Sequence, residues 1–290
     1  MCKVRRYTRA GLLALLLILF PAFANAQGRV FTKKMHLSDF TTKTTKVVLS
    51  GGAILDAALK TEVTRFWQLS PYEFCDAAEY EKLKEKPDYY FLRFVRNASE
   101  GEDQGGIIFL SLIKGGKEQS PDPENKRVEI IRVPIAPAEY SSGREFLYLG
   151  AFLGIIQDYV EDAMEADVKA YAGLSTYNAR FYSEPACMVW ISKDDLGFEI
   201  TREQQEKFLK DNVVIAPEND VDRVFRNGTR NTLVSYVVAP VSAQNGSWCY
   251  KMLISPDTHQ LYYYRRHKVR YNAWKGFQLS DIKEISKKRK

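Results

Sequence analysis

The sequence has 290 residues, of which 45 % are hydrophobic, and it carries 42 Lys and Arg against 36 Asp and Glu. This composition is ordinary for a globular protein and supports a core large enough for one large or two modest domains. The chain has four cysteines, too few for a disulfide-stapled scaffold.

Residues 1–26 have the pattern of a cleavable secretory signal peptide. Four basic residues and no acidic residue lie before the end of the apolar run 11–20, and the small-x-small sequence Ala24-Asn25-Ala26 follows. The run is too short to span a bilayer, which takes about 20 apolar residues. An uncleaved anchor is the alternative, but no apolar stretch continues past Ala26. We expect cleavage after Ala26, no transmembrane span in the mature chain, and a periplasmic or secreted location.

Removal of this segment changes the charge of the chain. Taking the four basic residues of 1–26 from the total leaves 38 basic against 36 acidic residues among the remaining 264. Most of the apparent basicity belongs to the targeting segment, so it is no evidence for a nucleic-acid partner, and we expect none. Cys75, Cys187 and Cys249 remain. One bridge, between Cys187 and Cys249, and buried single thiols are both open, and buried thiols are favoured.

The first half alternates short apolar strands with amphipathic helices. Gly51-Gly52 after the first strand is expected to form a tight turn, with Ser50 near the cap of the helix that follows. The predicted strands are 47–49, 71–75, 89–96, 106–113 and 127–133, and the predicted helices are 53–67, 77–86 and 144–170.

The second half repeats this order. A Thr201-x-x-Gln204 capping box opens its first helix. The predicted strands are 187–192, 213–215, 232–238, 247–254 and 261–269, and the predicted helices are 201–210, 219–226 and 274–285.

Both halves therefore read β-α-β-α-β-β-β-α, which predicts an α/β (α+β) fold made of a tandem pair of similar modules, with helices packed on mixed sheets. The expected organisation is a signal peptide (1–26), an amino-terminal extension (27–44), a first module (45–172), a linker (173–186), a second module (187–286) and a basic tail (287–290).

The region of about residues 45–113 carries a resemblance to known exported proteins. Its helix ends in Phe66-Trp67, a strand Ser70-Pro71-Tyr72-Glu73-Phe74 follows, and a charged helix leads to Tyr89-Tyr90-Phe91-Leu92. This arrangement resembles the TolB amino-terminal domain, the LpoB/CsgG-like group of periplasmic proteins and uncharacterised secreted proteins of Gram-negative bacteria. The resemblance implies a non-catalytic, partner-binding module, and no functional residue carries over from it.

Sequence motifs for catalysis are missing. The three histidines, His36, His259 and His267, have no partner at metal-binding spacing, and there is no H-E-x-x-H, C-x-x-C, G-x-S-x-G or phosphate-binding loop. His259 is expected to be a solvated turn residue. Gly150-x-x-x-Gly154 lies in an apolar run that predicts a buried helix between the sheet and the neighbouring domain. We therefore expect no catalytic residue, no metal and no cofactor.

The segment 262–271 has the most unusual composition, with tyrosines followed by basic residues. On a strand, alternate side chains share a face, so Tyr262, Tyr264, Arg266 and Lys268 are predicted to line one face. Arg and Tyr together suit an anionic or ring-bearing partner, such as an envelope protein or a glycan. The alternative is a solvent-facing strand whose tyrosines pack on the core while its arginines reach solvent.

Two functions remain open. The favoured hypothesis is an exported binding or envelope-assembly module without catalytic activity. The second is a periplasmic hydrolase that uses carboxylates, with Glu73 and Asp76 at the end of the second strand as candidates.

Overall fold

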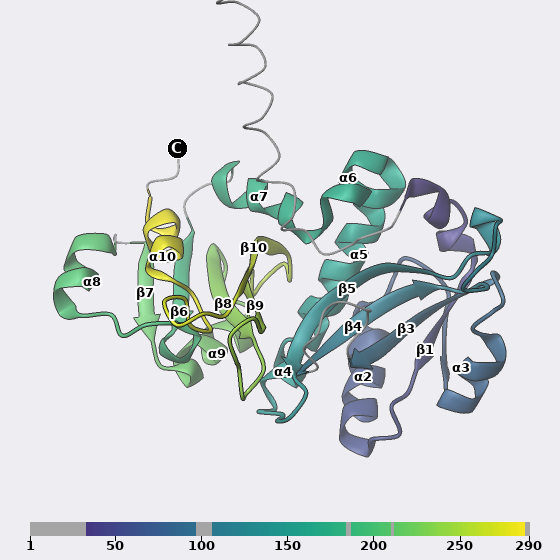
Figure 1. Cartoon of the computed structure of the whole chain (residues 1–290), viewed down its shortest axis with the longest axis horizontal. Helices are drawn as coiled ribbons and strands as arrows, with labels where there is room; N and C mark the ends of the chain where they lie inside the picture. Colours follow the sequence, from purple (N-terminus) through teal and green to yellow (C-terminus); the bar gives the residue numbers. More distant parts are fainter. Residues whose placement is uncertain (1–32, 97–105, 184–186, 210–211, 288–290) are drawn as a thin grey trace, which may run out of the picture. The chain divides into compact units, whose positions relative to one another are not determined.

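The computed structural model describes residues 33–96, 106–183, 187–209 and 212–287 (Figure 1). The predicted signal peptide lies outside these residues, as does the basic tail beyond Lys287. The described residues group into one compact unit. The described residues contain two five-stranded mixed sheets and nine α-helices, so the predicted α/β class is confirmed.

The first sheet has the strand order β2-β1-β3-β4-β5. Strand β1 pairs in parallel with β2 and β3, and the meander from β3 to β5 is antiparallel. The strands are β1 (Thr44–Val48), β2 (Tyr72–Cys75), β3 (Tyr89–Arg96), β4 (Ile107–Lys114) and β5 (Val128–Pro137).

Helices cover both faces of this sheet. On one face, α3 (Ala77–Leu83) buries Tyr80 against Val48, Cys75 and Phe91. The other elements of this half are the 3₁₀ helices η1 (Lys34–Leu37), η2 (Phe40–Thr42) and η3 (Pro123–Asn125), and the helices α2 (Ala53–Phe66), α4 (Arg144–Leu147), α5 (Leu149–Glu165) and α6 (Asp167–Ala172). Helix α5 packs on α2, β5 and η1.

The second sheet repeats the topology of the first. Its order, β7-β6-β8-β9-β10, has the same two parallel pairs around its first strand and the same antiparallel meander. The strands are β6 (Met188–Ser192), β7 (Val213–Ala216), β8 (Thr232–Val238), β9 (Trp248–Ile254) and β10 (Leu261–Lys268). The helices are α8 (Arg202–Phe208), α9 (Glu218–Arg226) and α10 (Leu279–Ile285), with the 3₁₀ helix η5 (Lys193–Asp195) after β6. Two sheets with one shared strand order support the predicted tandem pair.

Several predicted segments differ from the structure. The predicted helix 274–285 begins only at Leu279, and the strand predicted at 127–133 continues to Pro137 as β5. The predicted helix 144–170 is broken at Tyr148 and at Ala166, where the backbone leaves the helical region. The predicted linker contains η4 (Gly173–Tyr177) and α7 (Asn178–Ser183), and its Phe181 is fully buried in the core of the second module. The linker region therefore packs as part of the second module.

Helix α5 lies between the first sheet and the second module, as its glycine spacing predicts. A Cβ at Gly150 would come within 2.6 Å of the Phe66 ring of α2, and one at Gly154 would meet His259 of the β9–β10 turn at 3.4 Å. Both glycines therefore permit close approach of neighbouring elements. Within the described residues, no helix is both long enough and apolar enough to cross a bilayer.

Candidate functional site

The basic and tyrosine-rich segment forms β10, which pairs antiparallel with β9. Arg266 lies opposite Tyr250, and Lys268 lies opposite Trp248. Directly opposed residues of an antiparallel pair share a face of the sheet. We call the set Trp248, Tyr250, Tyr264, Arg266 and Lys268 the Trp248 surface.

Two cations lie on the ring of Trp248. The Arg266 guanidinium is 4.3 Å from the ring centroid and the Lys268 ammonium is 5.4 Å from it. Both distances fall within the range of a cation–π interaction, which holds the charged groups beside the aromatic ring. The Tyr250 and Tyr264 rings, 6.3 Å apart, continue this row of aromatic side chains.

The first module extends the Trp248 surface. Phe109 of β4 makes an edge-to-face contact with Tyr250 at 5.7 Å, and the Arg132 guanidinium of β5 lies 4.8 Å from the Phe109 ring. Phe109 and Tyr250 are buried. The rings of Phe109 and Tyr250 therefore form the buried base of the site. Its solvent-accessible part consists of the exposed Lys268 and the half-buried Trp248 and Arg266.

Tyr262 does not belong to this surface. A bulge between Leu261 and Tyr263 shifts the register there, and Tyr262 is only 7 % exposed, in the same core as Tyr263. Of the four residues that alternation places on one face, the structure brings Tyr264, Arg266 and Lys268 to the surface and leaves Tyr262 in the core.

On the opposite face of β10, acidic side chains of α10 pair with the basic side chains of the sheet. Arg265 lies opposite Lys251, an unfavourable pair of like charges, and both lie within ion-pair distance of Asp281. Tyr263 donates a hydrogen bond to the same carboxylate at 3.0 Å, and Arg265 also pairs with Glu284. These contacts hold α10 on the sheet and give this face a structural role.

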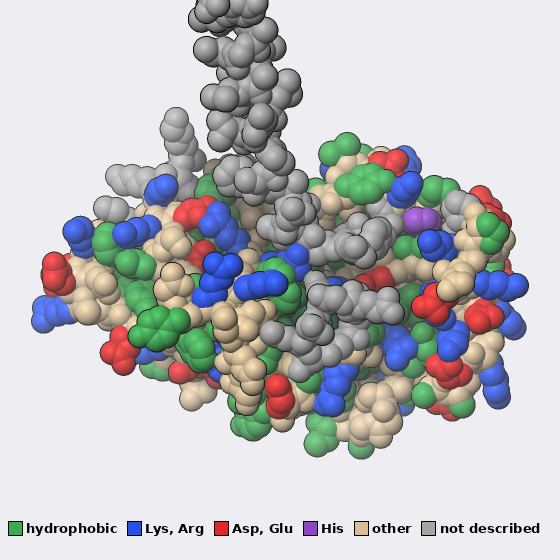
Figure 2. All heavy atoms as spheres, viewed as in Figure 1, with side chains coloured by type: hydrophobic (Ala, Val, Ile, Leu, Met, Phe, Trp, Pro, Cys, Tyr) green, Lys and Arg blue, Asp and Glu red, His purple; other side chains and the backbone are tan. Residues whose placement is uncertain are grey.

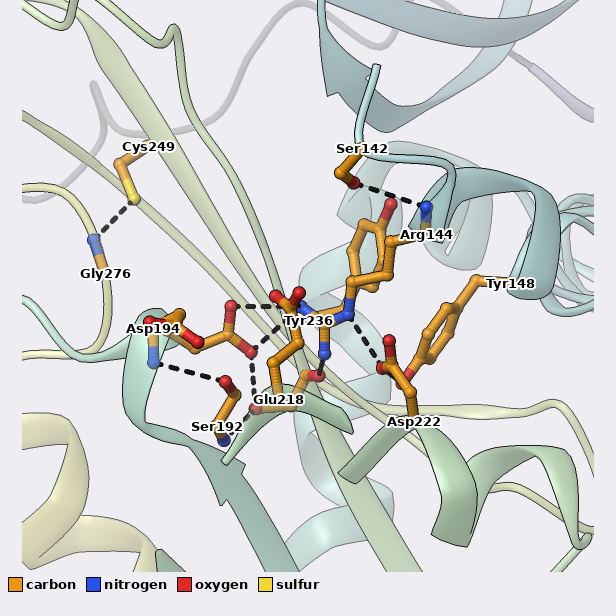
Figure 3. A network of polar contacts seen from close by, with 12 residues as sticks. Ser142, Arg144, Tyr148, Ser192, Asp194, Glu218, Asp222, Tyr236, Cys249 and Gly276 are labelled. Atoms are coloured by element: carbon orange, nitrogen blue, oxygen red, sulfur yellow. Dashed lines mark hydrogen bonds and ion pairs between the residues drawn. The ribbon is translucent and has the colours of Figure 1, made fainter. Parts of the chain in front are cut away.

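A second polar cluster lies around Arg144 of α4, whose guanidinium forms ion pairs with carboxylates of the second module (Figure 3). Its guanidinium contacts Asp222 at 2.8 Å, Asp195 at 3.2 Å and Glu218 at 3.3 Å, and it donates to the Ser235 carbonyl at 3.0 Å. The rings of Tyr148 and Tyr236 lie 5.3 and 5.0 Å from the guanidinium carbon.

The chemistry of this cluster is that of a buried ion pair. Burial opposes the charge of Arg144, but Asp195 and Asp222 keep its pKa well above the ordinary value. Burial raises the pKa of Glu218, and the nearby arginine opposes that shift. The Ser235 hydroxyl donates to Asp195, and Tyr148 donates to Asp222 at 3.0 Å. One cation of the first module is thus surrounded by three carboxylates of the second module. The cluster therefore connects the two modules.

This cluster has almost no signal in the sequence. Its members lie at positions 144, 195, 218, 222 and 235, so no short spacing joins them. Glu218 and Asp222, four residues apart on α9, are its one local pattern. The cluster was not among the sites predicted from the sequence.

The carboxylates proposed for hydrolysis take part in local structure. Glu73 pairs with Lys46 at 2.6 Å, together with Glu79. Asp76 caps α3 by accepting a hydrogen bond from the Glu79 amide at 2.7 Å. In the part of the chain that the structure describes, no group of three or more His, Cys, Asp or Glu side chains is placed to hold a metal ion.

His259 is not a solvated turn residue. Its ring stacks on Phe225 of α9 at 5.6 Å and contacts Phe66 of α2 at 5.0 Å. Burial lowers its pKa, and the charge of Arg65 adds to this effect. The expectation of a solvent-exposed histidine was wrong because the turn is inserted between the two modules.

The turn after β1 and the cysteines have local roles. Gly51 adopts a φ of +85°, and the amides of Ser50 and Gly51 donate to the Asp56 carboxylate at 2.7 and 2.9 Å. A side chain of α2 thus occupies the place where these amides could hold an anion. Cys75 and Cys249 are buried thiols, and burial raises the pKa of each to about 11.

Comparison with protein-family models, with curated protein sequences and with solved structures finds no match to this chain.

Proposed function

We propose that this chain is an exported binding protein without catalytic activity, and that the Trp248 surface binds an anionic partner of the cell envelope, either a protein or a glycan. The observation that carries the proposal is the placement of Arg266 and Lys268 on the ring of Trp248, at 4.3 and 5.4 Å. Such a group offers positive charge and a flat ring to the same partner.

The charge around this surface supports the proposal. Between Asp257 and Asp281 the sequence has no Asp or Glu, and it has four Lys and Arg besides Arg265, which pairs with Glu284 on the opposite face. A region of one charge sign attracts partners of the opposite sign, even when the chain as a whole is near neutrality. The resemblance of residues 45–113 to periplasmic partner-binding domains points to the same class of function.

The carboxylates support binding better than hydrolysis. Glu73 and Asp76 have the structural contacts described above, and Asp195 and Asp222 are held in ion pairs with Arg144. A general acid or base needs a carboxyl group that can reach a substrate proton.

The test is capture of a partner from envelope extract by the immobilised protein. The variant Arg266→Gln/Lys268→Gln removes both cations and keeps Trp248, and we expect it to lose the captured partner. Because Lys268 is exposed and Gln keeps much of the aliphatic part of the half-buried Arg266, stability should stay within about 1–2 kcal/mol of the wild type. Tyr264→Ala is less suitable because Tyr264 is half-buried and its ring contacts Tyr250.

The matched control is Arg202→Gln/Lys207→Gln, which removes two exposed cations from α8. It should capture the partner as the wild type does. Equal capture by both double variants would contradict the proposal. Hydrolysis of an envelope component that is lost in Glu73→Gln would instead favour the carboxylate-dependent enzyme.

A further inference from the structure

The segment between β10 and α10 forms a tight turn that presents aromatic and basic side chains at its tip. Arg270 and Ala273 exchange both backbone hydrogen bonds, at 2.9 and 3.0 Å, which leaves Tyr271 and Asn272 as a two-residue loop. Tyr271 is 105 % exposed and Trp274 is 46 % exposed. We call residues 270–275 the Tyr271 turn.

Packing and hydrogen bonds at its base fix the conformation of the Tyr271 turn. Val269 is fully buried beside Cys249 and Ala243, and its amide donates to the Ser247 carbonyl at 2.7 Å. The Trp274 carbonyl accepts a hydrogen bond from Gln278 at 2.6 Å and lies 2.9 Å from the His267 ring nitrogen. A turn that is already ordered loses little conformational entropy when its tip binds a partner.

The surroundings of the turn are apolar and basic. The Lys275 ammonium donates a hydrogen bond to the Val241 carbonyl at 3.1 Å. This contact places Val241, an apolar residue that is 45 % exposed, beside the turn. Arg270, within the turn itself, is exposed as well. Figure 2 shows several Lys and Arg side chains gathered over α10, β9 and β10, with apolar side chains beside them.

We propose that this protein binds an anionic lipid surface through the Tyr271 turn. Tyr and Trp favour the membrane–water interface, where the ring is buried and its polar edge stays in water. Basic side chains beside them add about 1 kcal/mol each on an anionic membrane. A fully exposed ring on a projecting turn suits insertion into a planar partner, whereas small ligands are held in concave sites.

This inference goes beyond the proposed function, because it involves other side chains than those that face Trp248 and it adds a location to the binding activity. The two are separable by experiment. Substitutions at Arg270 and Tyr271 test the lipid contact, while substitutions at Arg266 and Lys268 test the capture of an envelope partner.

The experiment is co-sedimentation with vesicles of phosphatidylcholine, with and without phosphatidylglycerol. We expect binding to the vesicles that contain phosphatidylglycerol, weaker binding at high salt, and little binding to phosphatidylcholine alone. Arg270→Gln should lower the partition coefficient about fivefold, as the loss of one charge near an anionic surface predicts. Tyr271→Ala should lower it several-fold, since the apolar area inserted is reduced.

The control variants are Tyr171→Ala, which removes an exposed tyrosine from α6, and Lys60→Gln, which removes an exposed cation from α2. Neither should change binding. All proteins carry the same amino terminus, so any contribution of residues 11–20 is common to them and cancels in the comparison.

Equal binding to both kinds of vesicle, or binding that Tyr271→Ala leaves unchanged, would overturn the proposal. Binding of a soluble anionic polysaccharide that depends on Tyr271, without binding to vesicles, would overturn it in favour of a glycan. Intact capture of an envelope partner by Tyr271→Ala would leave the proposed function standing in either case.

Discussion

Arg144 shows how much one buried side chain contributes to the connection between the modules. It lies in α4, whereas Asp195, Glu218 and Asp222 belong to the second module. Removing one partner of a buried ion pair leaves an uncompensated charge and is strongly destabilising. Replacing the whole pair by apolar residues changes the free energy of unfolding much less. The loss of Arg144 therefore destabilises the chain chiefly through the carboxylates that stay behind.

We predict that Arg144→Met lowers the free energy of unfolding by about 3–5 kcal/mol, measured by urea denaturation at pH 7. Addition of Asp222→Asn to this variant should restore part of the loss, because it removes one uncompensated charge. The exposed Arg202→Met provides the control and should change stability by about 0.5 kcal/mol or less. A loss of under 1 kcal/mol in Arg144→Met would contradict the prediction and would show that water solvates the carboxylates left behind.

Single residues were the hardest features to predict from the sequence. Alternation placed Tyr262 at the surface, but a bulge that no local pattern marks moves it into the core. Turn chemistry suggested a solvated His259, but packing between Phe66 and Phe225 depends on chain segments far apart in sequence. The shared face of Tyr264, Arg266 and Lys268 was predicted correctly, because they lie on one strand with a strong local composition.

At the scale of elements, strands were predicted more accurately than helices. The runs at 89–96 and 232–238 match β3 and β8 residue for residue, because apolar stretches bounded by turns define a buried strand. The capping box at Thr201 and Gln204 is also present. The breaks at Tyr148 and Ala166 were missed, since neither position carries a Gly or Pro and tertiary contacts decide them.

The two glycines of α5 are predicted to respond differently to alanine. Gly150→Ala places a Cβ 2.6 Å from the Phe66 ring and 2.7 Å from the Glu62 carboxylate, which should lower the free energy of unfolding by about 1–3 kcal/mol. At Gly154 the nearest atoms, in His259, lie at 3.4 Å, and the higher helix propensity of alanine, about 1 kcal/mol, should compensate for the tight contact.

Urea denaturation of both variants provides the measurement. A Gly154→Ala variant that is destabilised as much as Gly150→Ala would show that the contact between α5 and the β9–β10 turn is as tight as that with α2. Equal stability of both variants and the wild type would contradict the close packing of α5 on Phe66.

At the scale of the whole molecule, the predicted tandem order is matched by two sheets with the same strand order. The pattern of apolar runs was sufficient for this, because each module repeats the same sequence of strand and helix signals. The contacts that join the modules could not be predicted. They are formed by aromatic rings such as Tyr148 and Phe225, stacked at 3.9 Å, whose pairing has no local sequence signature.

We predict that mild acid destabilises the whole molecule. Burial lowers the pKa of His36, His259 and His267, so the unfolded chain binds protons more readily than the folded one. The contribution of these histidines to stability is fully present above their unfolded-state pKa of about 6.5. It is lost as the pH falls toward their lower folded-state pKa values. The melting temperature should therefore decrease between pH 7.5 and 5.5.

His259→Asn provides the test, because Asn tolerates the positive φ of +59° at this position and does not titrate. Its melting temperature should be lower at pH 7.5 and should change less with pH. Glu62, Glu218 and Glu284 have raised pKa values and oppose the loss once the pH nears the carboxylate range. A wild-type melting temperature that rises from pH 7.5 to 5.5 would contradict the prediction.

The shared topology gives the contact around Arg144 a direction. Arg144 follows the last strand of the first module, while its carboxylates follow the first two strands of the second. The contact is therefore heterologous, head to tail, and a repetition of it would extend an array instead of closing a symmetric pair. The position in the second module that corresponds to Arg144 is the segment between β10 and α10. The Tyr271 turn thus lies at the place from which the second module would make the corresponding contact.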